Sequence, residues 1–316
     1  GEKLERGLTQ LDAGESWLLE PEKLDEEGRF WSPGIRDHVR PGSWFHRTEC
    51  FGPVMGIMYA STLEEAVQWQ NDTGFGLTGG IHSLDDDEVD YWIEHVEVGN
   101  AYVNRGITGA IVQRQPFGGW KDSVIGSGAR AGGPNYVAQF GTWTDGDLDH
   151  GQVQLSAGVE KLLSDAPAEH REWLRRAAEL DELAWREEFS REHDLTGLKS
   201  EANILRYRPL PEPLPVHVGE GADMRDLWRL RLAAERAGAS ISEEITFRPG
   251  GRVRVLGAVP DGFHEKAAEV GAVILDGPVL ADGRRELLPF LLEQALSVTL
   301  HRFGVLRKRF WGTMKF

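Results

Sequence analysis

The amino-acid sequence predicts an α/β protein in which two units are joined by a helical segment. Its length of 316 residues is enough for about two domains with cores of their own. Short apolar runs alternate with amphipathic segments over the first 145 residues, and the alternation begins again near residue 195. The hydrophobic fraction of 40% and the charged fraction of 27% are ordinary for a globular chain, which argues against extensive disorder.

Within residues 1–145, three apolar runs are typical of buried strands, at residues 54–59, 77–82 and 100–104. A helix is expected between the first two, because Ser61 is followed by Glu64 at the spacing of a capping box. Three aspartates at residues 85–87 suit the positive end of a second helix. The apolar residues of that helix recur at spacings 0, 3, 4 and 7, which is one helical face: Val89, Trp92, Ile93 and Val96.

Residues 146–194 are rich in charge and are expected to form a helical linker. Its narrow apolar stripe, which would dock on a domain, is Trp173, Ala177, Leu180 and Ala184. A second α/β unit follows, with strands expected near residues 204–207, 216–218, 253–256, 273–275 and 297–300. Helices are expected at residues 260–269 and 284–294, and a further helix carries Leu227, Leu230, Ala234 and Ala237 in line and ends at Gly238.

The composition of the chain argues against several classes of partner and binding site. The chain has 51 acidic against 35 basic residues, a net charge of -16, so nucleic acid and anionic membrane surfaces would be repelled. The single cysteine cannot form an internal disulfide, and the ten histidines include no His-x-x-x-His pair, so no metal site is expected. No apolar run is long enough to span a bilayer, and the first residues lack the apolar core of a signal peptide. We therefore expect a cytoplasmic protein without a transmembrane segment.

A glycine-rich run at residues 126–133, GSGARAGG, matches the pattern G-x-G-x-x-A of a dinucleotide-binding loop. That pattern requires an apolar strand before it and a helix that opens within it. Here polar residues 120–123 precede the run and Pro134 follows it. We interpret the run as a structural loop, with a phosphate loop as the less favoured alternative.

Three ordered stretches carry a more specific signal: TECFGPV at residues 48–54, NDTGFGLTGGIHS at 71–83, and NAYVNRGITGAIVQRQPFGGWKDSVIGSGARAGGPNY at 100–136. Together they resemble the C-terminal half of an aldehyde dehydrogenase. The third stretch narrows the resemblance to L-glutamate γ-semialdehyde (1-pyrroline-5-carboxylate) dehydrogenases, and to the bacterial bifunctional proline utilization proteins among them. Later stretches resemble the C-terminal domain of the longer proline utilization proteins: GLKSEANILRYRPL at 197–210, RVLGAVP at 254–260 and ELLPFLLEQALSVTLHRFG at 286–304.

The resemblance implies three regions. Residues 1–145 would be the C-terminal half of the aldehyde dehydrogenase domain, residues 146–194 a helical linker, and residues 195–316 a smaller Rossmann-like α/β domain of proline utilization type. That last domain is not expected to bind nucleotide, and its Gly219-Glu220-Gly221 turn lacks the third position of a dinucleotide fingerprint. It would pack against the dehydrogenase domain and help to cover or stabilise its active site.

The resemblance also implies an NAD site. In the E-x-F-G-P motif, Glu49 would accept hydrogen bonds from the nicotinamide ribose hydroxyls and Phe51 would pack near the nicotinamide ring. A carboxylate offers two acceptor oxygens to a diol, and an aromatic face suits a flat ring. Leu77 matches a position that lines the cofactor site, although an ordinary core leucine is nearly as good an interpretation. Taken without the family, Glu49 is more simply a solvated surface carboxylate.

A substrate site is implied by residues 108–110 and 115–119, which resemble the loop that anchors the distal carboxylate of the aldehyde. Gly109 and Ala110 leave backbone N–H groups uncovered, and consecutive uncovered amides can bind an anion. Phe117 would pack against the methylene chain of the substrate. The alternative is an ordinary tight turn.

No catalytic residue is expected in this chain. Cys50 is the only cysteine, but it lies beside Glu49, and in an extended stretch it would point away from Glu49 and Phe51. The nucleophilic cysteine and the glutamate base of the family would precede residue 1, so the expected partners are the remainder of the catalytic domain, a small aldehyde substrate and a second copy in a homo-oligomer. FAD is expected only in a proline dehydrogenase domain outside this chain. Two alternatives stay open: a noncatalytic binding or scaffold module, and an aldehyde dehydrogenase of other specificity.

Overall fold

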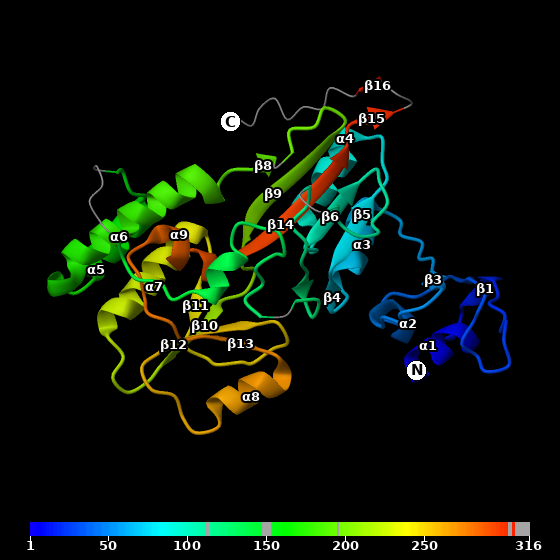
Figure 1. Cartoon of the computed structure of the whole chain (residues 1–316), viewed down its shortest axis with the longest axis horizontal. Coiled ribbons are helices and arrows are strands. Elements are labelled where there is room, and N and C mark those ends of the chain that lie inside the picture. Colours follow the sequence, from blue (N-terminus) through cyan, green and yellow to red (C-terminus); the bar gives the residue numbers. More distant parts are fainter. Residues whose placement is uncertain (112–113, 125, 147–152, 195, 303–304, 307–316) are drawn as a thin grey trace. The chain divides into compact units, whose positions relative to one another are not determined.

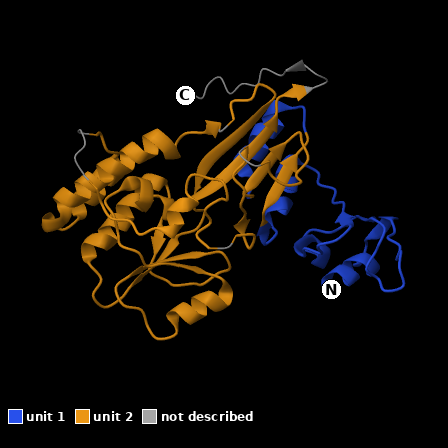
Figure 2. Ribbon diagram, viewed as in Figure 1, with its two compact units in different colours: residues 1–75, 83–97 blue, residues 76–82, 98–316 orange. Residues whose placement is uncertain are grey.

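The computed structural model describes residues 1–111, 114–124, 126–146, 153–194, 196–302 and 305–306 (Figure 1). It has the mixed α/β architecture that the sequence predicted. The chain divides into two compact units (Figure 2). Unit 1 comprises residues 1–75 and 83–97, and unit 2 comprises residues 76–82 and 98–316. Each unit is described by itself.

Unit 1 contains a small three-stranded sheet with the strand order β1-β2-β3. The strands β1 and β2 are antiparallel, whereas β2 and β3 are parallel. The strand expected at residues 54–59 is shorter than predicted, because only its first three residues pair with β2. The elements of unit 1 are α1 (Glu2–Thr9), β1 (Ser16–Leu19), β2 (Gly34–Asp37), α2 (Trp44–Arg47), β3 (Val54–Gly56), α3 (Leu63–Asn71) and α4 (Asp86–His95).

The two longer helices of unit 1 test the predicted helix signals. In α4, Asp85 caps the N-terminus by accepting from the amides of Asp87 and Glu88, and all four residues of the predicted apolar face are buried. In α3 the capping box lies one residue later than predicted. The Thr62 hydroxyl accepts from the Glu65 amide, and the Glu65 carboxylate accepts from the Ser61 amide at 2.6 Å. The box spacing therefore identified the helix but not its first residue.

Unit 2 is built on a five-stranded sheet with the order β5-β6-β14-β9-β8. The long strand β14 lies parallel to β6 on one side and antiparallel to β9 on the other. The prediction of a helix over residues 284–294 is wrong from Leu291, because Leu291 begins β14, which is buried on both faces; the residues before it, Leu288–Phe290, form a short 3-10 helix. The bounds are β5 (Thr78–Ile81), β6 (Asn100–Val103), β8 (His193–Asp194), β9 (Glu201–Pro209), α9 (Gly283–Glu286) and β14 (Leu291–Thr299). Short two-residue strands are β4 (Phe75–Gly76), β7 (Trp120–Lys121), β15 (His301–Arg302) and β16 (Val305–Leu306).

A second sheet in unit 2 is parallel throughout, with the order β11-β10-β12-β13. Its strands are β10 (Leu214–Val218), β11 (Ile241–Ser242), β12 (Arg252–Leu256) and β13 (Val273–Leu275), and its helices are α7 (Met224–Ala237) and α8 (Phe263–Val270). The four predicted core positions of α7 are buried, and Gly238 ends the helix with φ of 69°, as predicted. This left-handed conformation suits glycine because it has no Cβ.

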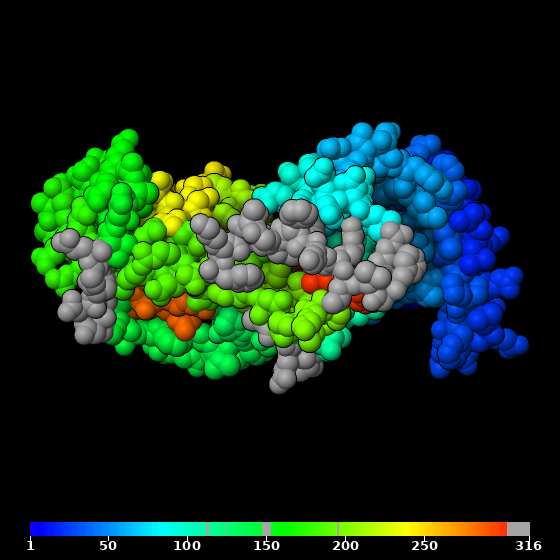
Figure 3. All heavy atoms as spheres, turned by 90° about the horizontal axis from the view of Figure 1, so that it is seen from above, coloured from blue at the N-terminus to red at the C-terminus, as the bar shows by residue number. Residues whose placement is uncertain are grey.

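The segment between β7 and β8 contains α5 (Ala157–Asp165) and α6 (Arg171–Ala184). The predicted stripe on α6 is displaced by about one residue: Ala177 is buried, but the fully buried neighbours are Leu174, Ala178 and Asp181. Asp181 is polar, so a hydrophobic pattern could not include it. The helix α6 contacts α9, and in Figure 3 orange atoms of the late part of the chain lie beside green atoms of its middle part.

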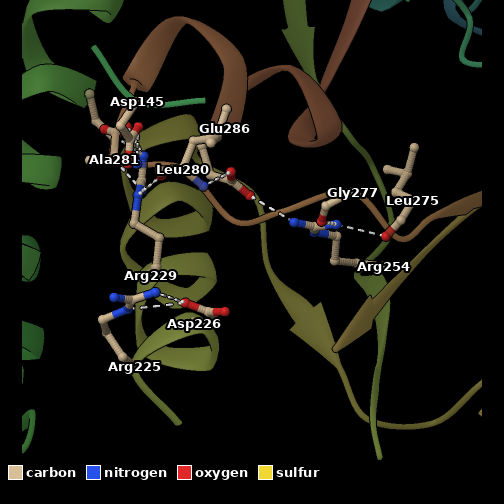
Figure 4. A network of polar contacts seen from close by, with 11 residues as sticks. Asp145, Arg225, Asp226, Arg229, Arg254, Leu275, Gly277, Leu280, Ala281 and Glu286 are labelled. Carbon is tan, nitrogen blue, oxygen red and sulfur yellow. Dashed lines mark hydrogen bonds and ion pairs between the residues drawn. The ribbon is translucent and has the colours of Figure 1, made fainter. Parts of the chain in front are cut away.

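Asp181 belongs to a buried polar network that holds the loop before α9. Figure 4 shows the part of this network around Arg229, Leu280 and Glu286. Arg229 on α7 donates to both carboxylate oxygens of Asp181, at 2.7 and 2.6 Å, and to the Leu280 carbonyl at 2.8 Å. Glu286 accepts from the Leu280 amide at 2.9 Å and lies 3.7 Å from the guanidinium of Arg254. These charges are compensated inside the protein, which is the condition for burying them.

Candidate functional site

The loop between α2 and β3 presents Glu49 and Phe51 to solvent. Phe51 is 88% exposed, and its φ of 50° places it in the left-handed region, which is uncommon for a residue with a Cβ. Glu49 is also exposed, and its carboxylate has no hydrogen-bond partner within the described ranges. A large exposed aromatic ring on a strained backbone favours a binding role over a packing role.

Cys50 faces in a different direction from these two residues. Its Sγ lies against Gly7 of α1, where an added Cβ would approach to 2.6 Å. Gly52, two residues on, lies so close to the side chain of Leu4 on the same helix that an added Cβ would approach it to 2.2 Å. The loop therefore rests on α1 through Cys50 and Gly52, which agrees with the expectation that Cys50 points into packing.

The environment of Cys50 does not activate a thiol. Burial raises the pKa of the Cys50 thiol above its ordinary value, although the positive charges of Arg36 and Lys3 act in the opposite direction. Neither basic residue is a sequence neighbour, so only the fold reveals their influence. A catalytic thiolate needs a lowered pKa, and Cys50 has the reverse.

A buried arginine supports the α1 side of this loop. Arg36 on β2 has a side chain with 0% exposure, and it forms an ion pair with the equally buried Glu15 at 2.6 Å. Its guanidinium also donates to the Gly7 carbonyl at 3.4 Å and lies 4.3 Å from the centre of the Phe45 ring. The network ties α1, β2 and α2 together beneath the loop, which keeps residues 49–51 in place.

In unit 2, Leu77 and Phe117 are connected through Asn100. The Asn100 side-chain amide donates to the Leu77 carbonyl at 2.8 Å and to the Gly118 carbonyl at 2.9 Å. Leu77 is 39% exposed, and Phe117, half-buried, forms a pair of backbone hydrogen bonds with Ala131 at 3.0 Å. The structure thus brings the predicted cofactor-side Leu77 and substrate-side Phe117 to one polar network. Glu49 and Phe51 belong to unit 1, and they are described apart from this network.

Arg130 is the centre of that network. It is 1% exposed, and it donates to the Gly118 carbonyl at 2.7 Å, to Asn100 Oδ1 at 3.0 Å and to the Glu293 carbonyl at 3.1 Å. It also bonds to the carbonyls of Gly99 and Pro116. Burial lowers the pKa of Arg130 to about 10, so it stays protonated at neutral pH. The carbonyls on both sides of Phe117 are therefore fixed by one buried cation.

The position of Arg130 also bears on the role of the glycine-rich run at residues 126–133, which contains this arginine. The run has no helix opening in it, and Gly126, Gly128 and Gly132 adopt positive φ in successive bends. The run agrees with the structural-loop interpretation, since its one long side chain, Arg130, is buried and hydrogen-bonded within the protein.

Gly109 and Ala110 lie on an exposed bend after β6. Gly109 has φ of 75°, and an added Cβ would meet nothing within 4 Å. The Tyr102 hydroxyl donates to the Gly109 carbonyl at 3.0 Å, which leaves the amide side of the bend facing outward. Within the described residues, neither the Gly109 nor the Ala110 amide donates a hydrogen bond. Two uncovered consecutive amides can accommodate an anion.

In the turn Gly219-Glu220-Gly221 of the second sheet, backbone polar groups form hydrogen bonds with other backbone groups of the protein. The Gly219 amide donates to the Leu256 carbonyl at 2.7 Å, and the Ala258 amide donates to the Glu220 carbonyl at 2.9 Å. Gly257, at φ of 79°, lies so close that an added Cβ would be 2.7 Å from the Glu220 carbonyl oxygen. The turn after β10 is thus packed against the turn after β12 at the position where a dinucleotide pyrophosphate would approach.

The described residues contain no group of three or more histidine, cysteine, aspartate or glutamate side chains arranged to hold a metal ion. No helix in the same ranges combines the length and the apolar character required to cross a bilayer.

Sequence reasoning missed Asn100 and Arg130 as supports of the candidate site. Asn100 begins a strand, and Arg130 lies in a glycine-rich loop, so each looked like a surface residue. The only available signal was that both fall inside the third resemblance stretch. Their partners are separated by up to 163 positions in the sequence, which no local pattern can detect.

Comparisons with known proteins cover both halves of the chain. Residues 2–144 match the aldehyde dehydrogenase family. The 1-pyrroline-5-carboxylate dehydrogenase of Bacillus pumilus is 40% identical over 114 residues, which is 36% of this chain and 22% of that protein. The enzyme of the same name from Bacillus thuringiensis is 41% identical over 114 residues, with the same coverage.

One solved structure matches nearly the whole chain. Proline utilization A (PutA) from Corynebacterium freiburgense is 60% identical, with a TM-score of 0.88, over 97% of this chain and 31% of that chain. The match extends through the part of this chain that follows residue 144. The chain spans less than a quarter of the length of the curated relatives and about a third of PutA.

Proposed function

Because residues 2–144 of this chain match the aldehyde dehydrogenase family, we propose that the protein containing it oxidises L-glutamate γ-semialdehyde to glutamate with NAD, as a step of proline breakdown. The observation that carries the proposal is the likeness to PutA, at 60% identity over both halves of the chain. The relatives named 1-pyrroline-5-carboxylate dehydrogenase support the choice of substrate, because that cyclic imine is the dehydrated form of the semialdehyde.

The cofactor contacts of this chain are Glu49, Phe51 and Leu77. The unpartnered carboxylate of Glu49 fits a ribose diol, and the outward ring of Phe51 fits a flat nicotinamide. Leu77, partly exposed, offers an apolar wall. When bound, NAD supplies the hydride acceptor that the oxidation needs. The contribution of these residues is to hold that acceptor in one orientation, which is an entropic contribution to the rate.

The substrate contacts are Gly109, Ala110 and Phe117. The uncovered amides of the first two can bind the carboxylate of the semialdehyde, and Phe117 can cover its methylene groups. This arrangement selects short aldehydes with a distal anion. The nucleophilic cysteine and the general base belong to the portion of the intact protein that this sequence does not include, since Cys50 is packed on α1 with a raised pKa.

Steady-state kinetics of the intact protein test the proposal. The semialdehyde and an uncharged aldehyde of the same chain length, pentanal, are compared as substrates. We expect a kcat/KM for the semialdehyde at least about 100-fold higher, because loss of a charge-assisted contact costs roughly 1.5–3 kcal/mol and the unfilled anion site adds to it. Equal kcat/KM values would instead favour an aldehyde dehydrogenase of other specificity.

A pair of variants tests the cofactor assignment. Glu49→Ala should raise the KM for NAD about 10-fold through loss of the two ribose hydrogen bonds, whereas Cys50→Ala should leave turnover within about 2-fold. Inactivity of the intact wild-type protein towards every aldehyde would favour the alternative of a noncatalytic module. A cytoplasmic location, a homo-oligomeric state and FAD in a separate proline dehydrogenase domain stay predictions.

A further inference from the structure

Two arginines on either side of the candidate anchor bend donate to one carboxylate. Arg105 precedes Gly109 and Ala110 in the sequence, and Arg114 follows them. Arg105 Nη1 donates to Glu201 Oε2 at 2.9 Å, and Arg114 Nη1 donates to Glu201 Oε1 at 2.5 Å. The Glu201 side chain is only 13% exposed. A single carboxylate thus joins Arg105 to Arg114, so Glu201 limits how far these two residues can separate.

A second contact repeats this pattern two residues further along the same strand. Gln115, which is 6% exposed, donates to Asn203 Oδ1 at 2.8 Å. The other end of the Gln115 amide accepts from the Ile111 backbone at 2.8 Å, and Asn203 in turn donates to the Thr196 hydroxyl at 3.1 Å. Residues two apart on a strand share a face, so Glu201 and Asn203 form one row on β9.

We propose that this row, Glu201 and Asn203 on β9, positions the substrate-anchoring bend, so that a strand outside the aldehyde dehydrogenase family match sets the affinity for the aldehyde's carboxylate. The inference rests on the proposed function. Neither residue touches the substrate; both act through Arg105, Arg114 and Gln115 on the amides of Gly109 and Ala110. They are positioning residues, and the strand that carries them is held in the sheet between β14 and β8.

Two readings of the Glu201 cluster predict opposite effects. In the first, the arginines attract the substrate anion and Glu201 merely weakens that attraction, so removal of its charge would lower the KM. In the second, which we propose, the carboxylate fixes Arg105 and Arg114 on either side of the bend, so its removal loosens the amide pair and raises the KM. The second effect dominates because Arg114 is 41% exposed and its field is screened by solvent, whereas misplaced amides lose contact directly.

The test uses the intact protein with Glu201→Gln, Asn203→Leu and a matched control, Glu160→Gln. Glu160 on α5 also forms a two-contact pair with an arginine, Arg175, at 2.9 and 2.8 Å, but it does not contact the bend. For Glu201→Gln and Asn203→Leu we expect the KM for the semialdehyde to rise about 10-fold, the loss of one charge-assisted or buried hydrogen bond, with kcat within about 2-fold. The KM for pentanal should not change, and Glu160→Gln should behave as wild type.

Each outcome has a distinct meaning. A wild-type protein that shows no preference for the semialdehyde would remove the proposed function itself. With that preference intact, an unchanged or lowered KM for Glu201→Gln would overturn the positioning role. Equal increases for semialdehyde and pentanal would also overturn it, since they indicate general damage. If Asn203→Leu does not fold, the two variants of Glu201 decide whether the positioning role holds, because this side chain is 13% exposed and not fully buried. Glu201→Asp, which keeps the carboxylate, should then raise the KM less than Glu201→Gln does.

Discussion

The backbone of Phe51 predicts that one substitution will raise stability and lower function together. A residue with a Cβ in the left-handed region costs about 1–2 kcal/mol, and Phe51 has φ of 50°. Phe51→Gly removes that cost but adds about 0.5–1 kcal/mol of backbone entropy to the unfolded chain. Because the ring is 88% exposed, little burial is lost. The net effect on the free energy of unfolding is a gain between about 0 and 1.5 kcal/mol.

The same substitution removes the ring that we assign to the nicotinamide. An aromatic contact contributes about 0.5–1.5 kcal/mol beyond burial, which corresponds to an increase of roughly 2- to 13-fold in the KM for NAD. Phe51→Ala is the matched control, because it removes the ring but keeps the Cβ and its strain. The two variants should share the kinetic defect and differ in stability, with glycine the more stable.

Urea unfolding of the intact protein, followed by tryptophan fluorescence, measures the first effect, and initial rates at varied NAD measure the second. A Phe51→Gly protein destabilised by more than about 1 kcal/mol would show that the ring packs or that the backbone relaxes, against the strain argument. An unchanged KM for NAD would remove Phe51 from the cofactor site. Only the combination of retained stability and weakened cofactor use supports the assignment.

Three further predictions concern other parts of the chain. Alkylation of Cys50 by iodoacetamide should be slower than that of a free thiol at neutral pH, and its rate should still increase above pH 9, because burial raises the pKa of the thiol; a plateau below pH 8 would contradict this. Asp181→Asn should cost about 3–5 kcal/mol in urea unfolding because it leaves the buried cation of Arg229 unpaired, whereas Glu160→Gln at an exposed pair should cost less than about 1 kcal/mol. Gly109→Val should strain the bend and raise the KM for the semialdehyde but not for pentanal, and a parallel increase for both aldehydes would argue against an anchor.

Elements with complete local signals were predictable from the sequence. The helix α7 has a capping aspartate at its start, apolar residues at helical spacing and a glycine just past its end, and all three signals agree. The helix α4 is similar, with Asp85 as its cap and a buried face that includes Trp92. In both cases the information that specifies the element lies within the element.

The prediction for the segment that forms β14 was wrong for the opposite reason. The run from Leu291 to Thr299 contains leucine, glutamate, glutamine and alanine, which favour a helix. It is a strand because β6 and β9 satisfy its backbone on both sides and because a buried strand needs no alternation of polarity. Both partners are distant in the sequence, so the pairing overrides the local preference.

The candidate site likewise contains residues that could be predicted from the sequence and residues that could not. Glu49, Phe51 and the 108–110 bend were located by their resemblance to a family, which encodes chemistry. Their supports were not: the left-handed backbone of Phe51 has no sequence signature in a residue that is not glycine. Buried polar residues such as Arg130 and Asn203 are indistinguishable from surface residues until the fold supplies their partners.

The central position of β14 has a consequence for how the chain can be divided. Removal of the residues after 145 would expose the hydrogen-bonding edge of β6, which β14 covers from Asn100 to Val103. It would also take away the Glu293 carbonyl, which accepts from both Trp120 and Arg130. Arg130 would lose this hydrogen-bond partner, which is costly for a charged group that stays shielded from water. The segment that carries the proposed substrate contacts therefore depends for its geometry on strands that follow it by more than 80 positions, and these strands lie outside residues 2–144, which match the family.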